Sequence, residues 1–282
     1  MRFVLALLVS LFSVLAWAQN VPPPALAANA WVLIDHATGQ VLADKDPDAR
    51  IEPASLTKLM TAYLTFSALK AGTLTPDQVV PVSTKAWRME GSRMFIEPNK
   101  PVTVDELIRG VIVQSGNDAC VALAETIAGS EEAFAALMNR EAQRLGMRNT
   151  HFTNSTGLPD PQLYTSARDL ALLASAVVRD FPEFYGLYSL KEYSYNGIKQ
   201  PNRNRLLYMD ATVDGMKTGH TSTAGYCLVS TAQRGPRRLI SVVLGAASDT
   251  VRAQESLKLL NFGFQFYDTV KRYAADEALS QF

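Results

Sequence analysis

The chain has 282 residues with 27 basic and 27 acidic side chains, so its formal net charge at neutral pH is +0. This balance excludes the strongly basic surface that nucleic-acid binding needs, and we expect no nucleic-acid partner. A hydrophobic fraction of 48% and a charged fraction of 19% are those of a globular protein with one large or two modest domains.

The first predicted element is an export signal. Arg2 supplies a positive end, residues 3–17 are almost wholly apolar, and residues 16–18 (Ala-Trp-Ala) place small side chains where signal peptidase reads. We therefore expect a signal peptide over residues 1–18 and an exported mature protein. A permanent membrane anchor is the alternative, but the apolar run is short for ~30 Å of hydrocarbon.

Strands are predicted near both ends of the chain, with helices between them. A hairpin is expected first, with strands at 31–35 and 40–43. The predicted helices cover residues 55–70, 104–113, 117–127, 131–145, 166–178 and 249–266. The later strands cover residues 192–195, 225–232 and 239–245. This order favours an α+β fold in which the first and last strands meet in one sheet around a helical insert.

Ser55 and Lys58 form the first candidate catalytic pair. They stand three residues apart at the head of a predicted helix, which places both side chains on one face, a turn apart. A serine hydroxyl is a weak nucleophile and needs a base within hydrogen-bond reach. Lys58 can be that base if burial and nearby cations remove its proton. Taken alone, however, the pair is more typical of a capping serine followed by a solvated lysine.

Two later motifs change that interpretation through their order and spacing. Ser115 and Asn117 lie in a polar loop between predicted helices, where a hydroxyl can relay a proton and an amide can bind a peptide group. Lys217, Thr218 and Gly219 are expected on a strand edge. There the lysine can hold a carboxylate, the threonine can donate a hydroxyl, and the glycine leaves room for a substrate backbone. The three motifs form one set, with gaps of about 60 and about 100 residues.

The two cysteines, Cys120 and Cys227, sit in runs of small and apolar residues. Two cysteines in an exported chain could pair, but isolated cysteines in such runs are more often small core side chains. Neither has metal-ligand spacing, and we expect no metal site and no cofactor.

Together the motifs resemble those of low-molecular-mass penicillin-binding proteins of the D-alanyl-D-alanine carboxypeptidase type, serine peptidases of the β-lactamase/DD-peptidase superfamily. The similarity extends from about residue 31 to about residue 270. Four stretches match over their whole length, at residues 52–61, 114–119, 201–207 and 214–221. The resemblance implies an α+β fold with an antiparallel sheet flanked by helices. It also implies a peptidase domain at 19–270, into which an all-helical subdomain is inserted at roughly 85–180.

The resemblance also implies a role for each matched residue. Ser55 would form the acyl-enzyme with Lys58 as its general base, and Ser115 would pass a proton between the lysines and the leaving amine. The substrate-binding residues would be Asn117, Lys217, Thr218, Gly219, His220 and Arg252.

Within that group, Asn117 would position the substrate amide, and Lys217 and Thr218 would flank the terminal carboxylate. The backbone N–H groups of Ser55 and His220 would form the oxyanion hole. Arg252 would help to recognise the carboxylate, with a solvated charge on the last helix as the alternative.

The implied function is removal of the terminal D-alanine from peptidoglycan pentapeptides. The implied partners are peptidoglycan stem peptides, with β-lactam antibiotics as covalent inhibitors. The implied location is the periplasm or the outer face of the cytoplasmic membrane. Family members commonly continue into a small β-rich domain and an amphipathic membrane helix. Residues 271–282 would be the start of such a domain, and peripheral membrane contact would be possible only through a C-terminal region beyond residue 282.

Other hydrolase classes lack their motifs in this sequence. A Ser-His-Asp hydrolase is disfavoured because the only histidines are His36, His151 and His220 and no Gly-x-Ser-x-Gly elbow surrounds a serine. A metal hydrolase is disfavoured because the chain has no His-Glu-x-x-His cluster.

Three alternatives remain closer to the resemblance. A class A-like β-lactamase needs a water-activating glutamate in Glu-x-x-Leu-Asn, and none lies between Asn117 and Lys217, while Gly116 replaces the usual aspartate. A DD-endopeptidase shares all three motifs, although the Ser-Gly-Asn motif and His220 favour the carboxypeptidase. A non-catalytic wall-binding module would not need every reactive residue that the chain retains.

Overall fold

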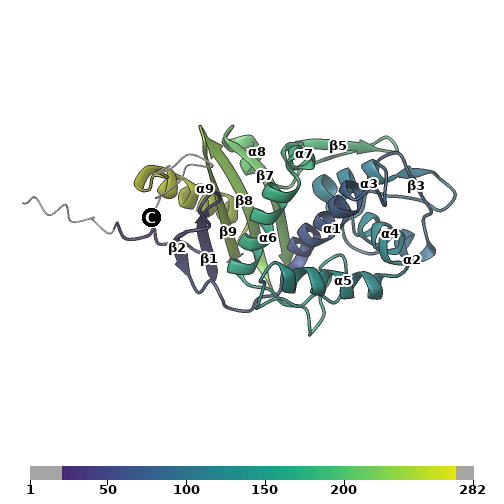
Figure 1. Ribbon diagram of the computed structural model, residues 1–282, viewed down its shortest axis with the longest axis horizontal. Helices are drawn as coiled ribbons and strands as arrows, with labels where there is room; N and C mark the ends of the chain where they lie inside the picture. Colours follow the sequence, from purple (N-terminus) through teal and green to yellow (C-terminus); the bar gives the residue numbers. More distant parts are fainter. Residues whose placement is uncertain (1–20, 271–282) are drawn as a thin grey trace, which may run out of the picture.

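The computed structural model describes residues 21–270, which form a five-stranded antiparallel sheet with helices on both faces (Figure 1). The expected signal peptide and the segment 271–282 lie outside the described residues. Strands β1 and β9 come from opposite ends of the described chain and pair antiparallel, from Ala30 opposite Leu244 to Asp35 opposite Leu239. The predicted α+β fold with one sheet closed by the first and last strands is confirmed.

The main sheet has the strand order β2-β1-β9-β8-β7. Its strands are β1 (Ala30–Asp35), β2 (Val41–Lys45), β7 (Val213–Thr221), β8 (Gly225–Arg234) and β9 (Arg237–Ala246). Two small hairpins stand apart from it, β3 (Val79–Val80) with β4 (Val102–Thr103), and β5 (Glu192–Tyr195) with β6 (Ile198–Pro201). Strand β7 is therefore an edge strand, with one side that pairs with none of the described strands.

Each of the six predicted helices has a counterpart, and three helices of four residues each among the described residues were not predicted. The helices are α1 (Lys58–Lys70), α2 (Thr84–Trp87), α3 (Val104–Arg109), α4 (Asn117–Ala128), α5 (Glu131–Arg144), α6 (Ala167–Asp180), α7 (Pro182–Tyr185), α8 (Leu206–Met209) and α9 (Asp249–Phe266). Two 3₁₀ turns, η1 (Ala54–Thr57) and η3 (Gly186–Ser189), and one π-helical turn, η2 (Gly110–Gln114), complete the helical elements of the described residues.

Two predicted helices differ from their expected form, and both differences lie at candidate catalytic residues. The helix expected from Ser55 begins as the 3₁₀ turn η1, and the α-helix starts only at Lys58. The helix expected over 104–113 changes after Arg109 into the π-helical turn η2, which ends at Ser115 in the left-handed conformation. Such local departures from α-helical geometry are typical of functional sites.

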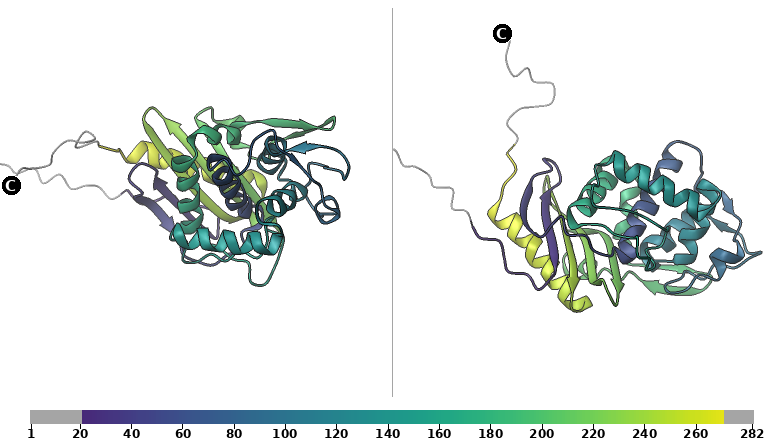
Figure 2. Two further views of the ribbon diagram at one scale, coloured as in Figure 1. Left: turned by 45° about the vertical axis from the view of Figure 1, so that its right-hand side comes forward. Right: turned by 90° about the horizontal axis from the view of Figure 1, so that it is seen from below.

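The sheet is covered on both faces, so its strands have a core on each side. Val32 and Ile34 of β1 pack into the core beneath α1 and α6, whereas Trp31 and Leu33 pack beneath α9. Alternate residues of a strand point to opposite faces, and here both sets are apolar. Figure 2 shows α9 along one face of the sheet and the helical half of the molecule beyond the other.

Helix starts agree with the capping residues in the sequence. Ser166 accepts a hydrogen bond from the backbone N–H of Asp169, and Thr103 and Glu106 form a reciprocal capping box at α3. Both cysteines are buried and free, in agreement with the small-core interpretation.

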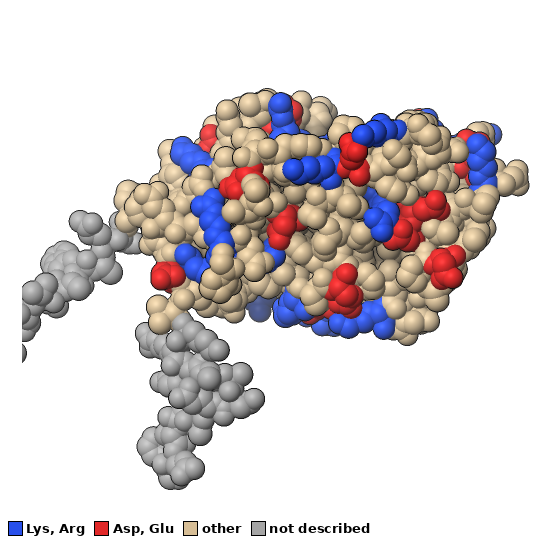
Figure 3. Space-filling view, turned by 90° about the horizontal axis from the view of Figure 1, so that it is seen from above, with Lys and Arg blue, Asp and Glu red and all other residues tan. Residues whose placement is uncertain are grey.

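The surface carries charges of both signs. On the face shown in Figure 3, lysine and arginine side chains alternate with acidic ones rather than forming a single-sign field. Between residues 21 and 270, none of the helices combines the length and the apolar character that crossing a bilayer requires.

The contact between α9 and the sheet depends on Gly263. A Cβ at this position would lie 2.6 Å from a methyl carbon of Leu239 and 2.6 Å from one of Leu33. We expect Gly263→Ala to lower the free energy of unfolding by about 1–3 kcal/mol, because the helix must move off the sheet. Urea unfolding measures this, with Gly186→Ala, which has open space around it, as the matched control. Equal stability of the two variants would contradict the packing argument.

Candidate active site

A polar pocket of about 330 Å³ lies where η1, the edge strand β7, the end of η2 and the start of α9 meet. It brings together residues from six separate parts of the chain. The lining residues are Ser55, Ser92, Ser115, Arg203, Thr218, Gly219, His220, Tyr226 and Arg252. Six of the nine predicted site residues line this pocket directly.

Ser55 and Lys58 are in hydrogen-bond contact. Lys58 Nζ lies 3.0 Å from Ser55 Oγ, and the lysine side chain is only 1% exposed. The same ammonium donates to the carbonyl oxygen of Thr156 at 2.6 Å. The structure therefore excludes the solvated-lysine alternative and places the Lys58 nitrogen within hydrogen-bond reach of the serine hydroxyl, where a base is needed.

The turn that carries the Thr156 carbonyl is built by Asn154. Its Oδ1 accepts from the backbone N–H groups of Thr156 and Gly157 and from the Thr156 hydroxyl. Gly157 has φ +82°, and a Cβ there would lie 1.8 Å from the Ala54 carbonyl oxygen. Only glycine lets this turn press against η1, so the turn and the nucleophile are held as one unit.

A second lysine–serine pair faces the first. Lys217 Nζ donates to Ser115 Oγ at 3.0 Å and to the Thr218 carbonyl at 3.0 Å, and Lys217 is 3% exposed. Ser115 has φ +59°, a conformation that costs energy for a residue with a side chain. The strained conformation aims its hydroxyl into the pocket.

Burial lowers the pKa of both lysines. The pKa of Lys58 falls to about 8, chiefly through loss of water and further through the nearby Arg203 cation. The pKa of Lys217 falls well below its ordinary value through burial and then through the charges of Lys58 and Arg203. Each shift favours a neutral amine, which is the form that can accept a proton from a hydroxyl.

Asn117 is placed differently from the other predicted residues. It is buried and does not line the pocket; its Nδ2 donates to the Glu90 carbonyl at 2.6 Å, and its backbone N–H donates to the Ser92 carbonyl. The next residue, Asp118, accepts from the backbone N–H groups of residues 94–96. Together Asn117 and Asp118 hold the loop that carries Ser92 against the pocket.

Gly219 has a packing role beyond the one predicted. We expected it to leave room for a substrate, and it does line the pocket. A Cβ on Gly219 would, however, point at η1, 3.1 Å from the Pro53 carbonyl and 3.3 Å from Ala54 Cβ. The glycine therefore also allows the turn that carries Ser55 to lie directly against β7.

Arg252 lies in the pocket wall and is only 6% exposed, so it is no solvated surface charge. Its Nη1 donates to the Gly219 carbonyl at 3.3 Å, and its guanidinium lies 5.5 Å from the Tyr226 ring centroid. The His220 ring lies tilted against the same tyrosine, with the two ring centroids 4.0 Å apart. These groups form a cationic, aromatic wall next to Thr218.

Sequence reasoning missed three groups in this site: Ser92, Arg203 and the Asn154 turn. Arg203 donates to Ser92 Oγ at 2.7 Å and contributes to the lowered pKa of both lysines. A signal for Arg203 was present, because it lies in the matching stretch 201–207. Ser92 and Asn154 lie in loops without a recognised motif, so only tertiary contacts identify them.

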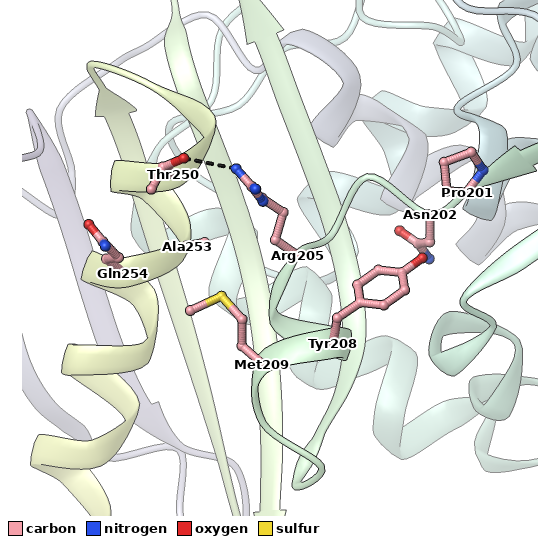
Figure 4. Close-up of a pocket in the computed structure, with 8 residues that line it drawn as sticks. All are labelled: Pro201, Asn202, Arg205, Tyr208, Met209, Thr250, Ala253 and Gln254. Carbon is pink, nitrogen blue, oxygen red and sulfur yellow. Dashed lines mark hydrogen bonds between the residues drawn. The ribbon is translucent and has the colours of Figure 1, made fainter.

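A larger hollow of about 530 Å³ lies between α8 and α9 (Figure 4). Arg205 reaches across it to Thr250 and to Asp249 at the start of α9. Its lining residues are Pro201, Asn202, Arg205, Tyr208, Met209, Thr250, Ala253 and Gln254. None of the predicted site residues lies there, so size alone does not locate the chemistry.

Comparison with known proteins decides the family. A family model described as D-alanyl-D-alanine carboxypeptidase matches residues 17–248. The chain belongs to the D-alanyl-D-alanine carboxypeptidase family. It is 49% identical over 269 residues to carboxypeptidase DacC of Escherichia coli K12, covering 92% of this chain and 67% of the relative. Against DacA of the same strain the identity is 47% over 254 residues, covering 88% and 63%.

Solved structures of related carboxypeptidases and penicillin-binding proteins share the fold. Penicillin-binding protein 5 of Haemophilus influenzae has a TM-score of 0.85 at 48% identity, covering 86% of this chain and 72% of that one. Penicillin-binding protein D2 of Listeria monocytogenes, solved with ampicillin bound, has a TM-score of 0.79 at 32% identity, covering 86% and 100%.

These comparisons confirm the resemblance, the DD-peptidase-like fold and the expectation of a carboxypeptidase enzyme. The relatives named here include no endopeptidase, β-lactamase or non-catalytic module. The chain spans about two thirds of the length of the curated carboxypeptidases it matches.

The lowered pKa of Lys58 makes a pH profile the direct test of its state. A base acts in its neutral form, and a pKa of about 8 leaves about one tenth of Lys58 neutral at pH 7. We expect the second-order rate constant of penicillin acylation to rise about tenfold per pH unit below 8 and to level off above it. Stopped-flow acylation kinetics measure the profile. A rise that continues unchanged to pH 10 would contradict a buried, neutral base.

Proposed function

We propose that this chain removes the terminal D-alanine from peptidoglycan stem peptides through an acyl-enzyme on Ser55. The observation that carries the proposal is the meeting of two lysine–serine pairs in one pocket, each with a 3.0 Å contact. Both lysines are buried with lowered pKa values, which suits them to proton transfer at neutral pH.

The contacts between these groups define the acylation step. Neutral Lys58 takes the proton of Ser55 Oγ as that oxygen attacks the carbonyl carbon of the penultimate D-alanine. The backbone N–H groups of Ser55 and His220 stabilise the negative oxygen. As the C–N bond breaks, the leaving amine receives a proton through Ser115, and D-alanine departs. Water then attacks the ester on Ser55 and releases the shortened peptide.

The cationic wall of the pocket suits a free terminal carboxylate. Thr218 and Arg252 both line the pocket, and Lys217 precedes Thr218 on β7 and donates to its carbonyl oxygen. A carboxylate bound there gains charge-assisted hydrogen bonds, which are stronger than neutral ones. We assign to Asn117 the placement of the substrate amide. Its Nδ2 donates to the Glu90 carbonyl in this structure, so the segment that carries Glu90 must move to free it for the substrate.

The remaining parts of the proposal concern location, partners and domains. We place the protein outside the cytoplasm, in the periplasm or at the outer face of the membrane, on the strength of the N-terminal sequence. Its proposed partners are the stem peptides and the β-lactams that acylate Ser55. The domain division at 19–270, with the helical insert at roughly 85–180, is supported by the run α2–α6 between the first and last strands.

Replacement of Ser55 tests the nucleophile. We expect Ser55→Ala to abolish covalent labelling by a fluorescent penicillin and to lower D-alanine release by more than about a thousandfold, since no other group can form the ester. The measurement compares free D-alanine from a pentapeptide with cleavage of cross-linked peptide dimers. Labelling that survives removes Ser55 from its role. Faster cleavage of dimers than of pentapeptide would replace the carboxypeptidase by an endopeptidase.

Replacement of Arg252 tests recognition of the carboxylate. We expect Arg252→Ala to lower kcat/KM about 30-fold for a peptide that ends in a free carboxylate, equivalent to about 2 kcal/mol for a lost charge-assisted bond. The same peptide with an amide end should lose far less. Arg205→Ala, in the neighbouring hollow, is the control. Equal losses on both peptides would assign Arg252 a structural role.

A further inference from the structure

Two exposed aromatic rings lie close to each other, one at the end of α2 and one in the loop that follows it. Trp87 is 41% exposed and Phe95 is 38% exposed. With Arg88 and Arg93 they form what we term the loop patch, around a hollow of about 590 Å³ completed by Ile96 and Glu97. Large exposed aromatic side chains that gather at a hollow are typical of binding surfaces.

An arginine guanidinium lies over each aromatic ring of the loop patch. Arg88 lies 5.9 Å from the Trp87 ring centroid, and Arg93 lies 5.1 Å from that of Phe95. No acidic side chain among residues 21–270 forms an ion pair with either arginine. The acidic residue that lines the hollow, Glu97, pairs with Lys100 instead. The patch therefore presents two uncompensated positive charges over two apolar faces.

The backbone forces this exposure. Phe95 has φ +68°, which is strained for a residue with a side chain, and the buried Asp118 carboxylate accepts from its backbone N–H at 2.8 Å. The neighbouring N–H groups of Met94 and Ile96 donate to the same carboxylate, while both of these side chains are buried. Strain that is held in place by a buried charge indicates a functional constraint on the ring it exposes.

Consecutive residues of one segment line the catalytic pocket and the loop patch. Ser92 lines the catalytic pocket and accepts from Arg203, whereas the next residue, Arg93, faces the hollow. The Arg93 carbonyl accepts from Gln200, which fixes the loop at this point. Because Ser92 and Arg93 are consecutive residues with Cα atoms ~3.8 Å apart, the same short segment borders both hollows.

We propose that the loop patch binds the acidic, sugar-bearing part of the wall strand whose D-alanyl end occupies the catalytic pocket. The unpaired guanidiniums match the carboxylates of the stem peptide, and the aromatic faces match the apolar faces of sugar rings. This inference rests on the proposed function, because it extends the same substrate beyond its last two residues. Contacts with the loop patch would then raise kcat/KM for a wall strand above that for a short peptide.

Two variants test the proposal on two substrates. They are Trp87→Ala and the double variant Arg88→Gln/Arg93→Gln, assayed for D-alanine release from an N-acylated tripeptide ending in D-Ala-D-Ala and from purified pentapeptide-rich wall strands. We expect kcat/KM to fall about tenfold on the strands and to change less than about twofold on the tripeptide. Salt should slow the unaltered enzyme on the strands, and the double arginine variant should lose that dependence.

The matched control is Arg140→Gln/Arg148→Gln, which removes two exposed arginines that form no ion pair within residues 21–270 and line neither hollow. It should behave as the unaltered enzyme on both substrates. Equal losses of the loop variants on tripeptide and strands would mean that the loop only positions Ser92, and would overturn the proposal. Unchanged rates on the strands would overturn it too. An unaltered enzyme that releases no D-alanine from either substrate would instead refute the proposed function itself.

Discussion

The burial of two lysine side chains in one pocket is the constraint around which this molecule is arranged. Lys58 and Lys217 are almost fully enclosed, and the charge of Lys58 lowers the pKa of Lys217 because a weakly screening interior makes like charges costly. Arg203 adds a third cation to the group. The site can therefore hold a neutral amine at neutral pH. The hydrogen-bond acceptors that compensate the buried nitrogens, the Thr156 carbonyl and the Ser115 hydroxyl, are the groups that define its geometry.

The fold supplies this arrangement through close backbone approach and local strain. Gly219 and Gly157 let η1 lie against β7 on one side and against the Asn154 turn on another. Three residues with side chains around the site, Ala54, Ser115 and Phe95, adopt left-handed conformations. Such conformations persist only where surrounding contacts over-determine them, and here the contacts are the edge strand, the π-helical turn and the buried Asp118.

The catalytic pocket and the loop patch differ in a way that suggests a division of work. The pocket is small and polar, and its reactive groups are buried, so it is suited to the D-alanyl end and to little else. The loop patch is open, aromatic and positively charged. Asp118 stands between them, because its carboxylate holds the segment whose residues face both hollows. Recognition of a long, anionic substrate and chemistry at its end are thus coupled through one loop.

Much of this protein was predictable from the sequence, because motif order and hydrophobic period are local properties. The α+β fold, the pairing of first and last strands and the range of α9 follow from spacing along the chain. The order of the motifs picked out Ser55, Ser115 and Lys217 as candidate site residues. Tertiary structure alone decided that Lys58 is buried, that Asn117 is bonded to a loop, and that Ser92 and the Asn154 turn belong to the site. These facts depend on desolvation and on contacts between distant segments, which leave no periodic signal in a single sequence.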